Sequence, residues 1–175
     1  ASADIINLSM HSNGMTINGD DGDDVIIGTE GGDIITGGAG VDTITGGDGI
    51  DTFAFAVGDN AGVDGAAVAD VITDFVVATD LLQFTAFADA VSVQQDAVQT
   101  AVDSLAASST DAQIATAMAL ANTTDLGVSF AVYEGNTYVY AETVGATATH
   151  VEAANVFIEL TGVTSLPTFA VDITG

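Results

Sequence analysis

The chain lacks basic side chains altogether. Its 175 residues include 25 Asp and Glu residues and no Lys or Arg, which gives a formal net charge of −25. Nucleic acids and anionic membrane surfaces are bound through cationic side chains, so this composition argues against both partners. Self-repulsion of this size opposes a compact fold, although 48% of the residues are apolar and suffice for a core. Bound metal cations or high salt would offset the repulsion.

Cysteine and long apolar runs are also absent. A chain without cysteine is compatible with a secreted protein that has no disulfides. Because no apolar run reaches the roughly 18 residues of a transmembrane helix, we expect no direct membrane insertion. The first residues, ASADIINLSM, show no basic region followed by a long apolar one, so no signal peptide is visible. Three alternatives remain: a signal has been removed, export uses no such signal, or the protein stays inside the cell.

The sequence also contains none of the motifs that mark common active sites. There is no HExxH, no GxSxG and no lysine-containing phosphate loop. The two histidines, His11 and His150, are far apart in the sequence and accompany no recognisable nucleophile. We therefore expect that the protein is not an enzyme, with an unfamiliar hydrolase as the alternative.

What the sequence has instead is a repeat of nine residues. Four contiguous blocks read GDDGDDVII (19–27), GTEGGDIIT (28–36), GGAGVDTIT (37–45) and GGDGIDTFA (46–54). Positions one and four are glycine in every block, position six is aspartate and position eight is a large apolar residue. The Gly- and Asp-rich part predicts a turn, and the last three residues predict a short strand whose central side chain faces inwards. Two blocks then form one coil of eighteen residues.

Stacked coils would place the aspartates above one another. Equivalent residues of adjacent coils lie about 4.8 Å apart, so Asp24 is expected over Asp42 and Asp33 over Asp51. Two carboxylates about 5 Å apart repel each other by roughly 3 kcal/mol at an effective dielectric constant near 20. No basic side chain is present to relieve this repulsion. A hard divalent cation such as calcium, which accepts about six to eight oxygen ligands, would relieve it.

The blocks follow the pattern GGxGxDxUx, and the segment resembles the calcium-binding repeats of the RTX (repeats-in-toxin) family. The resemblance implies a right-handed parallel β-roll in which each calcium ion lies between loops eighteen residues apart. It implies two calcium ions, and up to about four, bound by backbone carbonyls and by the position-six aspartates. The first site would use Asp20, Gly22, Asp24, Gly37, Ala39 and Asp42. The second site would use Thr29, Gly31, Asp33, Gly46, Asp48 and Asp51.

The two blocks that depart from glycine at position two, and the residues before the repeat, are less regular. Position two is Asp20 in the first block and Thr29 in the second, where the lost glycine freedom is expected to strain the turn. Residues 10–18, MHSNGMTIN, have Met15 where aspartate is expected, which favours a capping half-coil over a full site. His11 and Asn13 could still provide oxygen to a weaker ion over Asp33.

The residues after the repeat give further candidates. Asp59 and Asn60 could complete a third site with Asp42. The segment DVITDF (70–75) resembles the segment after the repeats in serralysin-type proteases and other type I secreted proteins. The acidic positions of this region are Asp70, Asp74 and Asp80, of which Asp74 is a candidate for an extra ion. We favour the interpretation that these three are solvated aspartates at strand ends.

The second half is expected to be β-rich, with an inserted helical hairpin at about 86–122. Apolar residues three to four positions apart predict an amphipathic first helix, and Thr110-x-x-Gln113 is a capping-box signature before a second one. The first helix is marked by Phe87, Val91, Val98, Val102 and Leu105; the second is marked by Ile114, Met118 and Ala121, with Asn122 as its stop. We favour a lid over an apolar sheet face, and a subunit contact is the alternative.

The tail from 128 to 163 reads as strands. YEGNTYVY (133–140) predicts a hairpin, and NVFIELTGV (155–163) resembles the last strand of RTX secretion modules, which implies export by a type I secretion machinery. The expected fold is therefore mainly β: a calcium-binding β-roll with a degenerate N-terminal cap over 1–60, continuing into a β-sandwich-like capping part over 61–175. The latter includes the helical insertion.

Three functions are compatible with these features. The first is a secreted structural protein that folds on meeting extracellular calcium and self-assembles into a surface layer, matrix or filament, with other copies of the chain as partners. The second is a C-terminal secretion and folding module of a larger secreted enzyme or adhesin. The third is a calcium-dependent adhesin module that binds a ligand on its sheet. Each places the chain outside the cell or at the cell surface.

Overall fold

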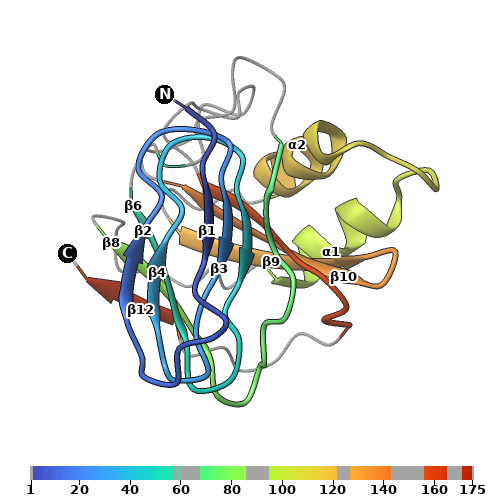
Figure 1. Cartoon of the computed structure of the whole chain (residues 1–175). Helices are drawn as coiled ribbons and strands as arrows, with labels where there is room; N and C mark the ends of the chain where they lie inside the picture. The colour runs from blue at the N-terminus through green and yellow to red at the C-terminus, as the bar shows by residue number, and fades with distance from the viewer. Residues whose placement is uncertain are drawn as a thin grey trace.

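The structure is a computed structural model that describes residues 2–56, 59, 68–85, 95–121, 127–142, 156–164 and 171–174. The described strands form two sheets that share one core (Figure 1). The seven-stranded sheet has the order β1 (Ile5–Asn7), β3 (Val25–Ile27), β5 (Thr43–Thr45), β7 (Asp70–Ile72), β11 (Val156–Leu160), β10 (Asn136–Glu142) and β9 (Gly127–Tyr133). The five-stranded sheet has the order β12 (Val171–Thr174), β8 (Leu81–Thr85), β6 (Thr52–Ala56), β4 (Ile34–Thr36) and β2 (Thr16–Asn18).

The first six strands form the predicted parallel roll. Successive strands alternate between the two sheets, and each pairs in parallel with the strand two further along the chain. Ile26 pairs with Ile44 and Ile35 with Phe53, a shift of eighteen residues in each case. The central residue of each short strand points into the core, because side chains alternate between the faces of a strand. The nine-residue period is thereby confirmed as half a coil.

The two sheets continue without interruption into the second half of the chain. β7 pairs in parallel with β5, and β8 pairs in parallel with β6, so the coils run past the expected boundary at residue 60. A single apolar core likewise includes residues of both halves, from Ile17 to Val163. The two expected parts thus share both sheets and one core, and their division at residue 60 stays a prediction. The β-roll with a sandwich-like continuation is confirmed as the fold class.

The predicted hairpin is confirmed in the seven-stranded sheet. β9 and β10 are antiparallel, with Tyr133 opposite Asn136 and a two-residue turn of Glu134 and Gly135 between them. Both turn residues have positive φ, at 48° and 89°, as a tight hairpin requires. β10 pairs with β11, which in turn pairs with β7 and joins the hairpin to the roll.

Two helices cover the outer face of the hairpin, as Figure 1 shows: α1 (Gln95–Asp103) and α2 (Asp111–Ala121). Their buried side chains pack on the ring of Tyr138 and its neighbours. These side chains are Val98, Val102, Ile114, Ala115 and Met118. The predicted lid over a sheet face is confirmed, and neither helix is long and apolar enough to span a bilayer. The side chain of Gln113 accepts a hydrogen bond from the Thr110 amide at 2.8 Å, which is one half of the predicted capping box.

The remaining expectations concern residues that the structure does not describe and the strands before the repeat. Phe87, Val91 and Asn122 lie outside the described residues. The strand β1 was not predicted from the sequence, and it adds a half-coil before the expected cap. β2 is the predicted capping half-coil, with Ile17 in register with Ile35.

Candidate metal centre

The position-six aspartates are stacked on the two sides of the roll. Asp24 lies over Asp42, since its amide donates a hydrogen bond to the Asp42 carboxylate at 2.8 Å. Asp33 lies over Asp51 with the same bond at 2.8 Å. All four aspartates are at least 99% buried. The predicted pairing of aspartates across adjacent coils is therefore present, and in each pair the amide of the earlier aspartate donates to the carboxylate of the later one.

Both stacks are longer than the four blocks. The Asp42 amide donates to the Asp70 carboxylate at 2.8 Å, and the Asp51 amide donates to the Asp80 carboxylate at 3.1 Å. Asp70 and Asp80 are buried, with 1% and 5% exposure. The interpretation of these two residues as solvated strand-end aspartates is therefore wrong. They occupy position six of further coils, where the buried amide of the preceding coil requires an acceptor.

The sequence signal for these extra members was concealed by spacing. Asp70 follows Asp42 by 28 residues, and Asp80 follows Asp51 by 29, instead of the regular eighteen. Residues 65–73 read GAAVADVIT, which keeps the block's first glycine, the aspartate at position six and the apolar residue at position eight. A search for degenerate blocks beyond residue 54 would have found Asp70.

The second oxygen of each aspartate turns back to the first glycine of its own block. A Cβ atom built on Gly37 would lie 2.2 Å from Oδ2 of Asp42, and one built on Gly46 would lie 2.4 Å from Oδ2 of Asp51. Side chains cannot approach this closely, so position one must be glycine for the carboxylate to take this place. The invariant first glycine thus serves the aspartate five residues later.

The carboxylates of the first stack fit a cation. Oδ2 of Asp24 and Oδ2 of Asp42 are, in the part of the chain that the structure describes, the buried side-chain oxygens and nitrogens without a hydrogen-bond partner. Burial, followed by the charge of Asp24, raises the pKa of Asp42 from 3.8 to about 6. Burial likewise raises the pKa of Asp51 to about 6, with the charges of Asp80 and Asp33 as further causes. Buried anionic oxygens of this kind require a proton or a cation.

The loops that carry the first stack are also in contact. The Ala39 amide donates to the Asp20 carbonyl at 2.9 Å, and the Gly22 amide donates to the Ala39 carbonyl at 2.8 Å. Residues of both expected halves of the first site are therefore adjacent. Gly37 belongs to the same loop as Ala39, and its carbonyl oxygen lies 2.4 Å from a Cβ built on Gly19.

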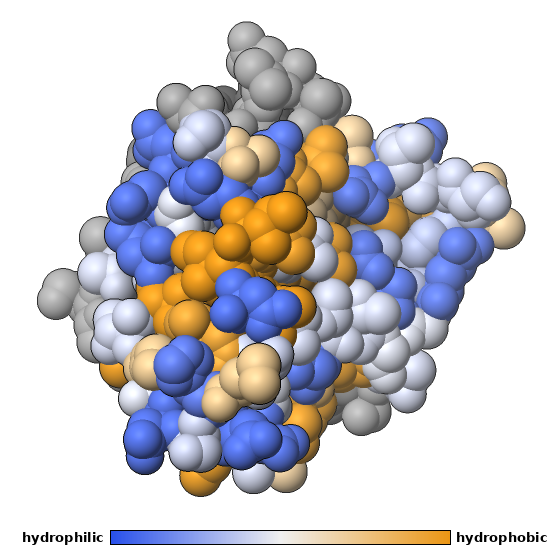
Figure 2. Space-filling view, viewed as in Figure 1, coloured by the Kyte–Doolittle hydropathy of each residue, from blue (hydrophilic) through white to orange (hydrophobic). Residues whose placement is uncertain are grey.

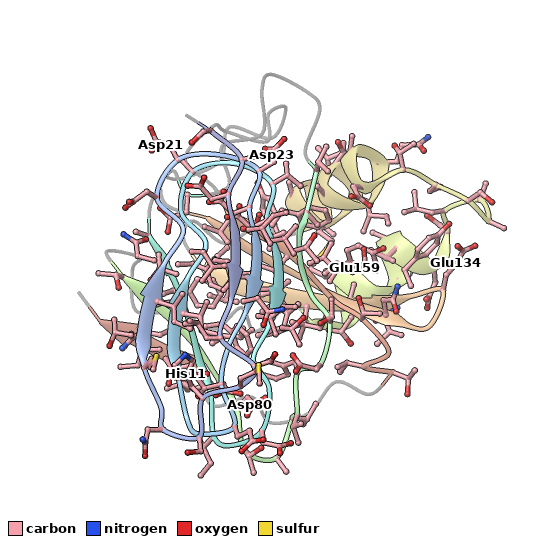
Figure 3. All side chains as sticks on the ribbon, in the orientation of Figure 1. His11, Asp21, Asp23, Asp80, Glu134 and Glu159 are labelled. Atoms are coloured by element: carbon pink, nitrogen blue, oxygen red, sulfur yellow. The ribbon has the colours of Figure 1, made fainter. Side chains whose placement is uncertain are left out.

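The second stack lies at the opposite end of the strands. In Figure 3, Asp21 and Asp23, beside the first stack, lie at one end, and His11 and Asp80 lie at the other. A Cβ built on Gly49 would lie 2.7 Å from the Gly31 carbonyl carbon, and one on Gly47 would lie 2.0 Å from the Thr29 carbonyl oxygen. The loops of 29–33 and 46–51, which include Asp48, therefore face each other as predicted.

The weaker candidates lie beside these loops. The Gly40 amide donates to the Asp59 carbonyl at 3.0 Å, which puts Asp59 next to the loop of Asp42. Asn60 lies outside the described residues. Asp74 accepts hydrogen bonds from the amides of Gly46 and Gly47, at 2.8 and 2.9 Å. Its carboxylate therefore contacts the loop of Asp51.

The loop before the repeat also contacts the second stack. The Glu30 amide donates to the His11 carbonyl at 2.8 Å, and a Cβ built on Gly31 would lie 2.9 Å from the Asn13 carbonyl carbon. The Met15 amide donates to the Asp33 carboxylate at 2.7 Å, so Met15 keeps the backbone position of the absent aspartate.

No group of three or more His, Asp or Glu side chains is arranged to hold a metal ion within the described residues. The aspartates instead meet in pairs, flanked by backbone carbonyls, and this is the donor set that the sequence predicts. Assignment of individual ligands stays a prediction.

Comparisons with known proteins agree with this geometry. The family model of the RTX calcium-binding nonapeptide repeat matches residues 18–53, in four copies. Among solved structures, the chain is similar to the solution structure of the AlgE6R3 subunit from the Azotobacter vinelandii mannuronan C5-epimerase. The identity is 22% and the TM-score 0.51, over 92% of this chain and 71% of that one. No curated protein matches the sequence.

The four blocks are thus RTX nonapeptide repeats, and the fold around them is a parallel β-roll. Repeats of this kind bind calcium ions, so calcium is the cation that the paired aspartates fit.

Proposed function

We propose that the chain is a secreted, non-catalytic structural protein whose β-roll forms when it binds extracellular calcium. The observation that carries this proposal is the first aspartate stack. Asp24 and Asp42 are buried with unpartnered carboxylate oxygens in a chain that has no Lys or Arg. Without a cation, their mutual repulsion and desolvation oppose the fold.

Calcium binding would then supply folding free energy. A site assembled from two coils does not exist in the unfolded chain, so the binding free energy stabilises only the folded state. Extracellular calcium modules have dissociation constants of about 0.1–1 mM. The chain would therefore stay unfolded at cytosolic calcium concentrations and fold outside the cell. Export in the unfolded state followed by folding outside the cell suits a type I secretion machinery, which we propose as a transient partner of the chain.

We assign the ligands of each ion to the carbonyls and aspartates of two facing loops. One ion would be held by the loops of Asp24 and Asp42, and a second by those of Asp33 and Asp51. The first ion would also bind the backbone carbonyls of Asp20, Gly22, Gly37 and Ala39. The second would also bind those of Thr29, Gly31, Gly46 and Asp48. Extension of the stacks to Asp70 and Asp80 supports up to two further ions, with Asp59 beside one of them.

The open edges of the roll support self-assembly. β1 and β2 are the end strands of their sheets, and edge strands offer unpaired backbone groups to neighbouring chains. Ile5 on β1 is 82% exposed, and Val25 on the adjacent β3 is 40% exposed. Figure 2 shows an apolar area over this part of the sheet. We propose that copies of the chain associate there once calcium has reduced their charge.

A second candidate is a folding module of a larger secreted protein. The observation that favours it is the similarity to a subunit of a mannuronan C5-epimerase. Both candidates require the same calcium-dependent fold, and they differ in whether the chain acts alone.

The test is a calcium titration of the chain after a chelator has removed all calcium, monitored by circular dichroism and light scattering. We expect a cooperative gain of β-sheet signal near millimolar calcium, and a much smaller gain with magnesium, which demands stricter octahedral geometry. A full β-sheet signal in the chelated chain would contradict the proposal. Light scattering that rises with the β-sheet signal would support assembly, whereas a chain that folds but stays monomeric would favour the module.

A further inference from the structure

The four loops of the repeat do not have the same backbone conformation. Three of them have positive φ at both position two and position four. These pairs are Asp20 and Gly22 (67° and 147°), Gly38 and Gly40 (107° and 150°), and Gly47 and Gly49 (103° and 118°). The loop of 28–33 is different, since neither Thr29 nor Gly31 has positive φ.

The residue at position two explains the difference. Glycine adopts positive φ freely, and aspartate tolerates the left-handed region because its short polar side chain bonds locally. Threonine is β-branched, and a β-branched residue at positive φ is a true outlier. Thr29 therefore excludes the conformation that the other three loops share, and the turn takes another course through Gly31 and Gly32.

The altered loop satisfies its own aspartate. The Thr29 amide donates to Oδ2 of Asp33 at 2.7 Å. The Thr29 hydroxyl lies 2.9 Å from Oδ1 of Asp33 and 3.1 Å from the Gly31 carbonyl oxygen, and its oxygen accepts from the Gly31 amide at 3.0 Å. Asp33 also accepts from Met15. Asp24 and Asp42, by contrast, each have an unpartnered Oδ2.

We propose that Thr29 makes the two sides of the roll unequal, so that the Asp24–Asp42 side takes calcium first and the Asp33–Asp51 side takes it later and more weakly. This inference rests on the calcium-dependent fold proposed above. Calcium at the second side has to replace the hydrogen bonds from Thr29 to Asp33 and to the Gly31 carbonyl oxygen. Two hydrogen bonds of ordinary net strength correspond to about a tenfold or larger difference in affinity. Thr29 is thus a positioning residue that sets the order of binding.

The experiment is a calcium titration in which NMR monitors the glycine amides of the loops on both sides of the roll. Gly37, Gly38 and Gly40 report on the first side, and Gly46, Gly47 and Gly49 report on the second. In the unaltered chain we expect the second group to respond at a calcium concentration about tenfold higher. In Thr29→Gly we expect the two midpoints to approach each other within about threefold.

Two further variants control for side effects. Thr43→Gly makes the same change at an exposed position of β5, outside the loops, and should leave the ratio of midpoints unchanged. Thr29→Val keeps the branched Cβ and the amide bond to Asp33 but removes the hydroxyl, so its ratio of midpoints should lie between those of the unaltered chain and Thr29→Gly. If Thr29→Gly fails to fold, the ratio of the two midpoints in the unaltered chain still tests the proposed order of binding.

The outcomes separate this inference from the proposed function. Equal midpoints on both sides of the unaltered chain would overturn the role of Thr29 and leave calcium-dependent folding intact. A ratio that persists in folded Thr29→Gly would also overturn it. Glycine amides that respond to calcium on neither side would overturn the proposed function itself.

Discussion

Replacing Gly38 by alanine tests how closely the coils of the roll approach one another. Gly38 has a φ of 107°, where a residue with a Cβ is disfavoured by about 1–2 kcal/mol. Its Cβ would in addition lie 1.8 Å from the Asp20 carbonyl oxygen of the adjacent coil. That backbone has to move, which weakens the two hydrogen bonds between Ala39 and the loop of Asp20, each worth about 1 kcal/mol net. We expect Gly38→Ala to lower the free energy of unfolding by about 3–4 kcal/mol.

The control is Gly135→Ala in the hairpin turn. Gly135 also has positive φ, at 89°, but a Cβ there would meet nothing within 4 Å. Only the conformational cost applies, so the expected loss is about 1–2 kcal/mol. Both variants are compared by urea unfolding at saturating calcium. If they lose equal stability, close packing of the coils is not what requires glycine in the loops, and our reasoning is refuted.

Two other predictions concern the aspartate stacks. Asp70→Ala removes the acceptor of the buried Asp42 amide and should lower the free energy of unfolding, measured in urea, by about 1–3 kcal/mol. The control, Asp103→Ala on the exposed side of α1, should change it by less than about 0.5 kcal/mol. Equal effects would show that Asp70 is not a structural member of the stack. The calcium-free chain should gain stability as the pH falls. Asp42 and Asp51 have pKa values of about 6 in the fold against 3.8 as the reference, so the folded state binds more protons between these values. Lowering the pH from 7.5 to 5 should therefore stabilise it by on the order of 1.4 kcal/mol per group, detected by circular dichroism, while a loss of β-sheet signal over this range would contradict the assigned burial.

Much of the roll could be predicted because its repeat is local and regular. The aspartate at position six and the apolar residue at position eight define both the turn and the strand, so the pairing of Asp24 with Asp42 follows from the period alone. The hairpin around Gly135 and the helices around Val98 and Ile114 were predicted for the same reason, since each depends on patterns within a few residues.

The remainder depends on contacts that the period does not encode. Asp70 and Asp80 join the stacks across irregular spacings, and their burial results from the continuation of the sheets by β7 and β8. The conformation of the Thr29 loop was expected only as strain. The structure shows a relaxed alternative instead, in which the amide and hydroxyl of Thr29 bond to Asp33.

The most direct test of the account is hydrogen exchange of the repeat segment, residues 18–56, measured by mass spectrometry with calcium and after complete chelation at neutral pH. The stacked carboxylates need a cation to remain buried together. We therefore predict strong protection of these amides in calcium, and exchange close to that of an unfolded chain without it. Protection that persists unchanged after chelation would contradict the central claim, because the stacks would then be stable on their own.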